Sequence, residues 1–142
     1  MQQSAAAAEA LARFYDVFSA GDVEAFDRGI AADPEAFVVG TQRVSSGREE
    51  WLGNFGRIAG KGLRLEAHDI RAYAEGSFAW AFDRPTFVMP DGSRLSTRLT
   101  AVLRDESGEW RLLHAHFSVA VPDPVAIEHC RVWLEELGQV PV

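Results

Sequence analysis

Two histidines, His114 and His116, stand two residues apart in a segment that alternates apolar and polar residues. On a strand this spacing puts both imidazoles on the same side. There they could share a zinc ion or move protons near neutral pH. The sequence offers no evident third metal ligand. We therefore expect no metal and no cofactor, and we interpret the pair as part of a structural or interface surface.

Arg84 follows an apolar segment and is the second candidate for chemistry. If Phe82 pairs opposite Leu99 and Arg84 opposite Thr97, the arginine lies on the inward, apolar face of a sheet. A guanidinium keeps its charge, so in such a place it needs an anion, a carboxylate or water. It could then clamp a carboxylate or phosphate of a ligand. The alternative is an arginine at a strand end that reaches solvent past Pro85.

Large apolar side chains could form the rest of such a site, because ligand pockets are mostly apolar with a few placed polar groups. The ligand-binding residues that we expect are Arg84, Trp51, Trp80, Phe82, Tyr15, Phe117, Leu99 and Ala101. The alternative for these side chains is an ordinary packed core. On the first interpretation the protein binds a small apolar molecule with an acidic head, and its chemistry stays unassigned.

Positioning these residues requires helices followed by a run of strands. Apolar periodicity and capping residues predict helices over 5–20, 22–31 and 46–60, and a short strand over 36–40. The third helix opens with Ser46 and Glu49 at capping-box spacing. Period-two alternation between glycine-containing turns predicts strands over 63–73, 77–89, 94–104 and 110–121. A last helix, over 123–138, starts at Asp123 and Pro124.

Helices that are segregated from an antiparallel meander define the α+β class, with a curved sheet wrapped on the helices. The chain has 142 residues, which suits one domain over 1–142. The helix over 123–138 is then a C-terminal extension of that domain.

The two faces of the last strand differ in polarity. Leu113, Ala115 and Phe117 are all apolar and should face the helices. The opposite face is mixed and too apolar for free solvent, so it should form a homodimer. This strand should pair with 94–104 in a register that puts Thr100 opposite His114. The interface residues that we expect are His114, His116, Trp110 and Leu112.

Charge and cysteine content limit the partners and the location. Fourteen lysines and arginines against 21 acidic residues give a net charge of −7, which disfavours nucleic acid and anionic membranes as partners. No basic n-region of a signal peptide precedes the first helix, and no apolar run approaches the ~20 residues of a membrane span. The single cysteine, Cys130, cannot form an internal disulfide. We therefore expect a cytoplasmic protein, with Cys130 buried on the apolar stripe of the last helix.

Three segments resemble the nuclear transport factor 2-like superfamily. The stretch 14–22 resembles the end of the first helix in that superfamily, and 46–49 resembles the start of its third helix. The stretch 108–118 is similar to the last strand of SnoaL-like, ketosteroid-isomerase-like members and of the calcium/calmodulin-dependent kinase II association domain. The resemblance covers about 9–122 and implies a cone-like sheet that encloses a cavity. The superfamily holds isomerases, cyclases, dehydratases, transport factors and oligomerisation domains, so it does not assign the chemistry.

The resemblance also says which catalytic groups to look for. Aligned through Gly21, Phe14 takes the place of the oxyanion tyrosine of the ketosteroid isomerases, and Ala101 takes the place of their second oxyanion acid. The base aspartate falls in 38–40, which holds no acid. The kinase association domain carries an inward arginine at the position that matches Arg84.

Three functions remain open from the sequence. The first is the binding of a small ligand, and the second is an isomerase or cyclase with displaced acid–base residues such as Asp33 or Glu35. The third is an oligomerisation module with a filled cavity. An inward, unpaired carboxylate in the cavity would favour the enzyme.

Overall fold

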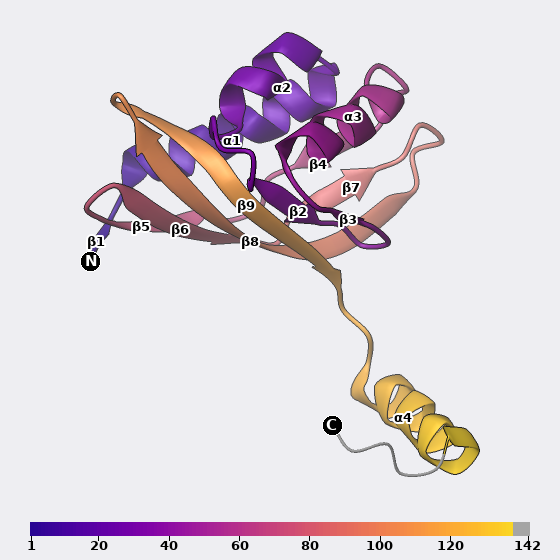
Figure 1. Ribbon diagram of the computed structural model, residues 1–142. Coiled ribbons are helices and arrows are strands. Elements are labelled where there is room, and N and C mark those ends of the chain that lie inside the picture. The colour runs from indigo at the N-terminus through magenta and orange to yellow at the C-terminus, as the bar shows by residue number, and fades with distance from the viewer. Residues whose placement is uncertain (138–142) are drawn as a thin grey trace.

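The computed structural model describes residues 1–137, in which four helices accompany nine strands (Figure 1). The helices are α1 (Ala5–Ala20), α2 (Val23–Gly29), α3 (Arg48–Ile58) and α4 (Asp123–Leu137). The strands are β1 (Gln2–Gln3), β2 (Phe37–Val39), β3 (Val44–Ser45), β4 (Arg64–Glu66), β5 (Arg71–Glu75), β6 (Phe78–Asp83), β7 (Thr86–Val88), β8 (Arg94–Glu106) and β9 (Glu109–Val119). The end that we predicted for the last helix, residue 138, lies outside the described residues.

Helix α1 has a well-defined cap at each end. The Ser4 hydroxyl oxygen accepts a hydrogen bond from the backbone N–H of Ala7 at 3.2 Å. Gly21 ends the helix in the left-handed region, with φ +68°, and a Cβ atom at this position would lie 2.4 Å from the backbone nitrogen of Gly60. A glycine is therefore needed both for the turn and for the close approach of the chain after α3.

Helix α3 starts differently from the capping box that we predicted. Gly47 occupies the N-cap position without a side-chain cap. The backbone N–H of Ser46 donates to the carboxylate of Glu50 at 2.8 Å, one residue beyond Glu49. The helix nevertheless presents Trp51 and Phe55 to the core, as their spacing of four residues requires.

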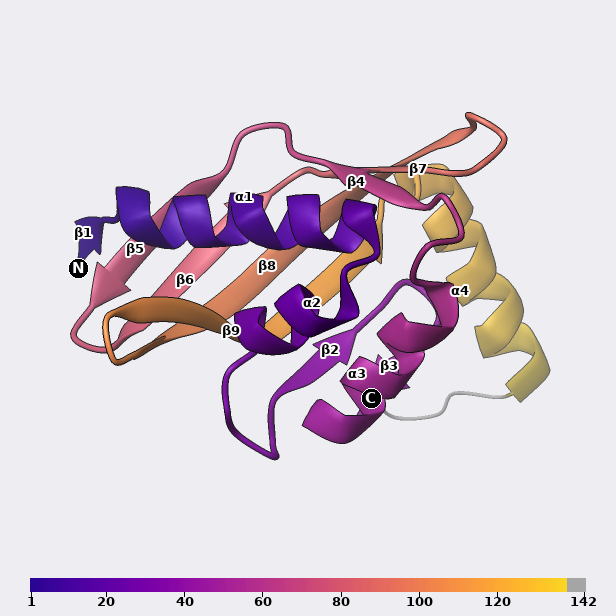
Figure 2. The same cartoon turned by 90° about the horizontal axis from the view of Figure 1, so that it is seen from above.

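The sheet runs in the order β1-β5-β6-β8-β9-β2-β3, and β7 pairs with both β4 and β8. Its pairs are antiparallel except for β2 beside β9, which is parallel. The sheet is thus mixed rather than purely antiparallel. Helices α1, α2 and α3 cover one face of the sheet, and α4 is separate from this group (Figures 1 and 2). This arrangement confirms the α+β class and the curved sheet wrapped on N-terminal helices.

The register between β6 and β8 differs by one residue from our prediction. Asp83 pairs with Leu99, and Phe82 pairs with Thr100. Because one residue of slip exchanges the two faces of a strand, Ala79, Ala81 and Asp83 point inward. The physical cause is the break that follows β6, where the Pro85 carbonyl accepts hydrogen bonds from the backbone and the hydroxyl of Thr97.

The β8–β9 hairpin is tighter than predicted and contains a bulge. Its turn is the two-residue Ser107–Gly108, with φ +58° and +88°, typical of the type I′ hairpin turn. A register shift between Val102 and Leu103 then exchanges the faces along the strand. As a result Leu112 is buried in the core rather than exposed on the outer face, and His116 rather than His114 pairs with Thr100.

Helix α4 extends away from the body of the molecule (Figure 1). Ile127 and Cys130 are both exposed, so the predicted burial of Cys130 is wrong. The stretch 120–122 leads the chain off the sheet before the helix begins. No helix in the described part of the chain has the length and apolar character needed to cross a membrane.

Candidate functional site

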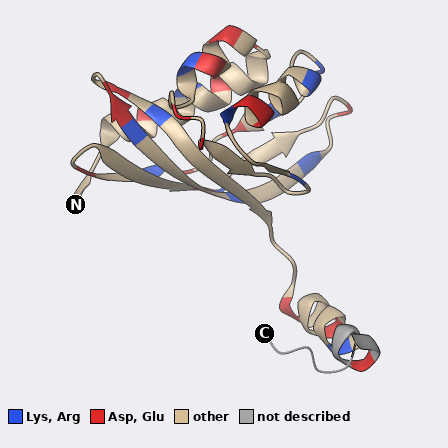
Figure 3. Cartoon of the chain, in the orientation of Figure 1, with Lys and Arg blue, Asp and Glu red and all other residues tan. Residues whose placement is uncertain are grey.

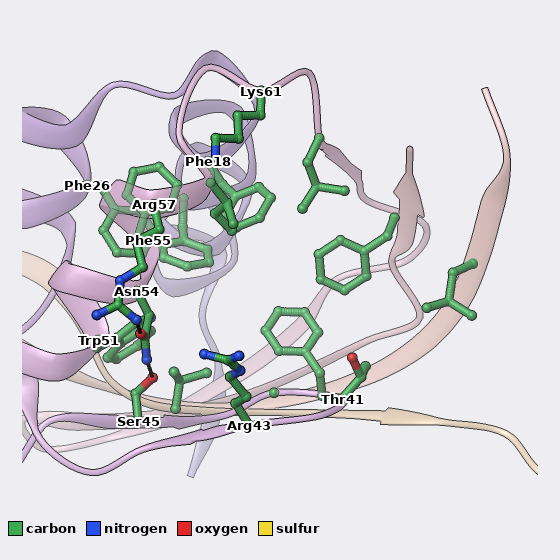
Figure 4. A pocket seen from close by; sticks show the side chains of 18 of the residues that line it. Phe18, Phe26, Thr41, Arg43, Ser45, Trp51, Asn54, Phe55, Arg57 and Lys61 are labelled. Carbon is green, nitrogen blue, oxygen red and sulfur yellow. Dashed lines mark hydrogen bonds between the residues drawn. The ribbon is translucent and has the colours of Figure 1, made fainter. Parts of the chain in front are cut away.

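A pocket of about 530 Å³ lies between the helices and the inner side of the sheet, within the size range typical of small-molecule sites (Figure 4). Helix α3 contributes one wall, the β2–β3 turn a second and strands β7–β9 a third. Most of its surface is apolar. The seven aromatic residues that line it are Phe14, Phe18, Phe26, Trp51, Phe55, Phe87 and Phe117.

These rings pack on one another in a continuous wall. Phe26 and Phe55 are stacked, with 3.7 Å between the ring centroids and 11° between the planes. Phe18 meets Phe87 edge-on at 6.0 Å, and Phe87 lies 5.3 Å from Phe117. Stacked and edge-on contacts of this kind stabilise aromatic pairs, so the rings together form an apolar wall.

Three positive side chains also line the pocket, each from a different segment. Arg43 comes from the β2–β3 turn, Arg57 from α3 and Lys61 from the loop after α3. Within residues 1–137, none of the three forms a salt bridge. The described lining contains no aspartate or glutamate. The pocket therefore presents uncompensated positive charge in a chain whose net charge is −7, and it favours an anion.

A chain of hydrogen bonds runs along the α3 wall. An N–H of the Arg57 guanidinium donates to Asn54 Oδ1 at 3.1 Å, and Asn54 Nδ2 donates to Ser45 Oγ at 2.7 Å. The three residues run from exposed Arg57 through half-buried Asn54 to Ser45, which is 3% exposed. This chain of polar groups thus connects solvent to a buried hydroxyl in a mostly apolar lining.

Of the residues that we predicted for the site, only two line this pocket. They are Trp51 and Phe117. Tyr15, Leu99 and Ala101 are buried in the core but outside the described lining.

The remaining three predicted residues lie elsewhere, because the β6 register differs from our prediction. Trp80 is 44% exposed and Phe82 is half-buried on the outer side of the sheet. Arg84 is exposed beyond the end of β6. The expectation that Arg84 faces inward is therefore wrong, and the alternative of a strand-end arginine describes its position.

The cations of the pocket were missed by sequence reasoning, although one signal was present. Lys61 lies in the loop beyond the end of α3, where helix spacing does not apply, but Arg57 follows Asn54 by three residues, next to the aromatic stripe of α3. Such spacing places side chains on neighbouring positions of a helix surface. Arg43 lies in the turn between two short strands, where no periodicity indicates direction.

Asp83 is the buried carboxylate on the inward face of the sheet, and its partners are backbone amides. It accepts from the N–H of Asp69 at 2.8 Å and from that of His68 at 3.3 Å. The Tyr15 hydroxyl is buried without a hydrogen-bond partner in the described part of the chain. Burial raises the pKa of Tyr15, and the negative charge of Asp83 raises it further. Asp83 anchors the β4–β5 loop and lies outside the pocket lining.

A row of five side chains crosses the outer face of the sheet. Register places Tyr73 beside Trp80, Trp80 beside Val102, Val102 beside His114 and His114 beside Phe37. Tyr73 and Trp80 are stacked at 4.7 Å, and Phe37 lies 4.2 Å from the His114 ring. We call these five residues the outer row.

The other predicted interface residues are distributed over the fold. His116 is exposed, Trp110 is half-buried, and Leu112 is in the core. Leu112 therefore cannot contact a partner through this face.

The molecule is an α+β protein in which helices cover one face of a curved, open sheet. A pocket lies between these two layers. A family model described as a SnoaL-like domain matches residues 7–122. The chain belongs to this SnoaL-like family. A comparison with curated proteins found no match.

Several solved structures share the fold of this chain. A protein of unknown function with a cystatin-like fold from Nostoc punctiforme has a TM-score of 0.71 and 21% identity, covering 88% of this chain and 99% of that chain. A protein provisionally described as a dehydratase of the NTF2-like family, from Streptomyces avermitilis, has a TM-score of 0.70 and 19% identity. The match covers 82% of this chain and 96% of that chain. A protein provisionally described as a calcium/calmodulin-dependent protein kinase type II association domain, from Thiobacillus denitrificans, has a TM-score of 0.66 and 18% identity. The match covers 79% of this chain and 93% of that chain. At these identities the likeness shows the fold.

Proposed function

We propose that this SnoaL-like protein binds a small apolar molecule with an acidic head in the aromatic pocket. The observation that carries the proposal is the composition of the lining, in which seven aromatic rings accompany three cations and no carboxylate of the described residues. Arg43, Arg57 and Lys61 surround the acid group, and the rings of Trp51 and Phe117 contact the apolar part. An acidic head remains the expected ligand feature, with these cations in place of Arg84.

Binding is favoured over isomerase or cyclase chemistry by the groups that the pocket lacks. Acid–base catalysis needs a side chain that exchanges a proton near neutral pH, most often histidine, aspartate or glutamate. The described lining holds none of these. The inward carboxylate, Asp83, is engaged with backbone amides outside the pocket.

The test is calorimetric titration with 2-naphthoate and with its neutral analogue, naphthalene-2-carboxamide. We expect the wild type to bind the acid more tightly. The double variant Arg43→Met, Lys61→Met should lose roughly tenfold in affinity for the acid and little for the amide, because charge-assisted hydrogen bonds are lost. Arg84→Met serves as the matched control, since it removes an exposed arginine outside the pocket, and it should leave both affinities unchanged. Equal affinity for acid and amide, or no binding of either, would refute the proposal.

We also propose a homodimer through the outer sheet face, on the observation of the outer row. Phe37 and Trp80 in this row are 38% and 44% exposed, and they belong to a contiguous row of mainly apolar side chains, the kind of surface feature that marks contact sites. The likeness to a protein provisionally described as an association domain is in keeping with self-association.

Sedimentation equilibrium tests the dimer. Trp80→Glu places a charge in the centre of the face and should convert the protein to monomer. Val23→Glu alters a residue of α2 that is equally exposed, at 45%, and should leave the dimer intact. A wild type that is monomeric at tens of micromolar overturns the proposal.

A further inference from the structure

The Ser45 hydroxyl acts as an acceptor in the hydrogen-bond chain of the pocket wall. An arginine side chain only donates hydrogen bonds, so the atom of Asn54 that faces Arg57 at 3.1 Å must be the amide oxygen. The amide nitrogen of Asn54 then faces Ser45 Oγ at 2.7 Å and donates to it. Arg57 thereby determines which way the Asn54 amide points.

The consequence for Ser45 follows from its single proton. A serine hydroxyl carries one donor and can accept two hydrogen bonds. Its oxygen accepts from Asn54, and the proton has no acceptor among the hydrogen bonds of residues 1–137. Ser45 is 3% exposed and lines the pocket. Figure 4 shows Ser45 beside Asn54 in the pocket wall. A buried donor without an acceptor is costly, so the hydroxyl proton is available to an acceptor that enters the pocket.

We propose that Ser45 is a specificity-determining residue that selects ligands with a second oxygen acceptor apart from their acidic head. The inference rests on the proposed function and adds to it the class of ligand: an aromatic acid that also carries a carbonyl or similar neutral oxygen. The difference in exposure between the three cations and Ser45 supports two separate contacts, one for the acidic head and one for the neutral oxygen. Arg43, Arg57 and Lys61 are exposed and hold the acid at the mouth, whereas Ser45 is buried. Chains of hydrogen bonds polarise their members, which strengthens the Ser45 hydroxyl as a donor.

The experiment compares two acids of the same charge and shape. 4-Acetylbenzoate carries a ketone oxygen where 4-isopropenylbenzoate carries a methylene group. We expect calorimetry to show that the wild type prefers the ketone by roughly tenfold, the effect of one hydrogen bond to a buried donor. Ser45→Ala should abolish this preference without weakening the isopropenyl acid, and Ser45→Thr, which retains the hydroxyl, should preserve it. Ser46→Ala alters the neighbouring, exposed serine and should change neither affinity.

A second variant tests the orienting step and does not alter Ser45. Asn54→Asp replaces the amide donor by a carboxylate of the same shape that can only accept, so Ser45 should turn its proton toward position 54. Both acids should bind more weakly because of the added negative charge, and the preference for the ketone should vanish. Circular dichroism of each variant verifies the fold.

The outcomes separate the two proposals. If both acids bind the wild type with equal affinity, or if the preference survives in Ser45→Ala or Asn54→Asp, the role of Ser45 is overturned and the acid-binding pocket stands. If 2-naphthoate binds the wild type and neither benzoate does, the role of Ser45 is overturned and the acid-binding pocket stands. If none of the three acids binds, the proposed function fails and the role of Ser45 fails with it.

Discussion

Glu106 accepts the backbone N–H of Ala32 through both of its carboxylate oxygens, at 3.0 and 3.1 Å, across 74 residues of sequence. The same carboxylate accepts from Arg104 at 2.6 Å and pairs with Arg111 at 3.4 Å. Acidic and basic residues gather accordingly at the tip of the β8–β9 hairpin (Figure 3). Glu106 thus ties this hairpin to the segment between α2 and β2, which leads into the β2–β3 wall of the pocket.

The substitution Glu106→Gln should destabilise the fold. Glutamine retains one acceptor oxygen but leaves two partly buried arginines without their shared charge, and we expect a loss of about 1–3 kcal/mol in the free energy of unfolding. Urea titration measures it. Glu109→Gln is the matched control, because Glu109 is 72% exposed and contacts Arg111 at the surface, where ion pairs contribute little. Equal stabilities of the two variants would contradict the role of Glu106.

The same cluster should make stability depend on acid pH. The pKa of Asp33 is lowered by the Glu35 backbone N–H and by Arg104. Burial alone would raise the pKa of Glu106, but hydrogen bonds from Arg104 and Ala32 lower it on balance. Carboxyls with a lowered pKa contribute stability that is present above their ordinary range, near pH 4, and is lost as the pH falls through the lowered values.

Urea titrations between pH 6 and pH 3 should therefore show stability falling with pH. The free energy of unfolding should change less steeply with pH in Glu106→Gln than in the wild type, because the variant lacks one of the coupled carboxyl groups. Parallel slopes in the two proteins would show that the cluster is not the source of the dependence.

The fold could be predicted because its signals are local. Alternation of apolar residues and the Ser107–Gly108 turn indicate the β8–β9 hairpin, and Ser4 and Gly21 limit α1. The parallel pairing of β2 with β9 could not be predicted, because no local pattern determines which distant strand a three-residue strand joins.

The site was less predictable, because single-residue register decides its lining. The break after Asp83 and the register shift between Val102 and Leu103 each exchange inward and outward faces. As a result Trp80 lies on the outer side and Leu112 in the core. Periodicity shows that two faces differ but does not reveal where a strand slips. Trp51 lies on a regular helix, where spacing alone determines the face, and it is part of the pocket lining.

Gly21 should tolerate no side chain. Gly21→Ala combines a positive φ with a Cβ that would meet the Gly60 nitrogen at 2.4 Å, so we expect a loss above about 1 kcal/mol in the free energy of unfolding. Gly29→Ala, at the end of α2, meets nothing within 4 Å and has no positive φ, and it should be neutral or slightly stabilising. Thermal unfolding of the two variants measures the difference. If Gly21→Ala were as stable as Gly29→Ala, the close approach of α1 to the Gly60 turn would be refuted.

The dimer should weaken in acid because of His114. Burial lowers the pKa of His114, the Phe37 carbonyl opposes this, and His116 adds to the lowering. The carbonyl accepts the hydrogen bond at 3.1 Å, so Nδ1 donates in the neutral ring. A histidine whose pKa is lowered favours the structure that contains its neutral form. The stabilisation by neutral His114 is complete above the ordinary histidine pKa of about 6.5. It is lost as the pH falls through the lowered pKa of His114.

Covering the outer row with a second copy would desolvate His114 further, so protonation should cost more in the dimer than in the monomer. Sedimentation equilibrium between pH 8 and pH 5 should show a dimer constant that weakens below about pH 6.5. His114→Asn keeps a neutral donor for the Phe37 carbonyl and cannot be protonated in this range, so its dimer constant should vary less with pH. A wild-type constant that stays flat to pH 5 would place His114 outside the interface, even if the protein is dimeric.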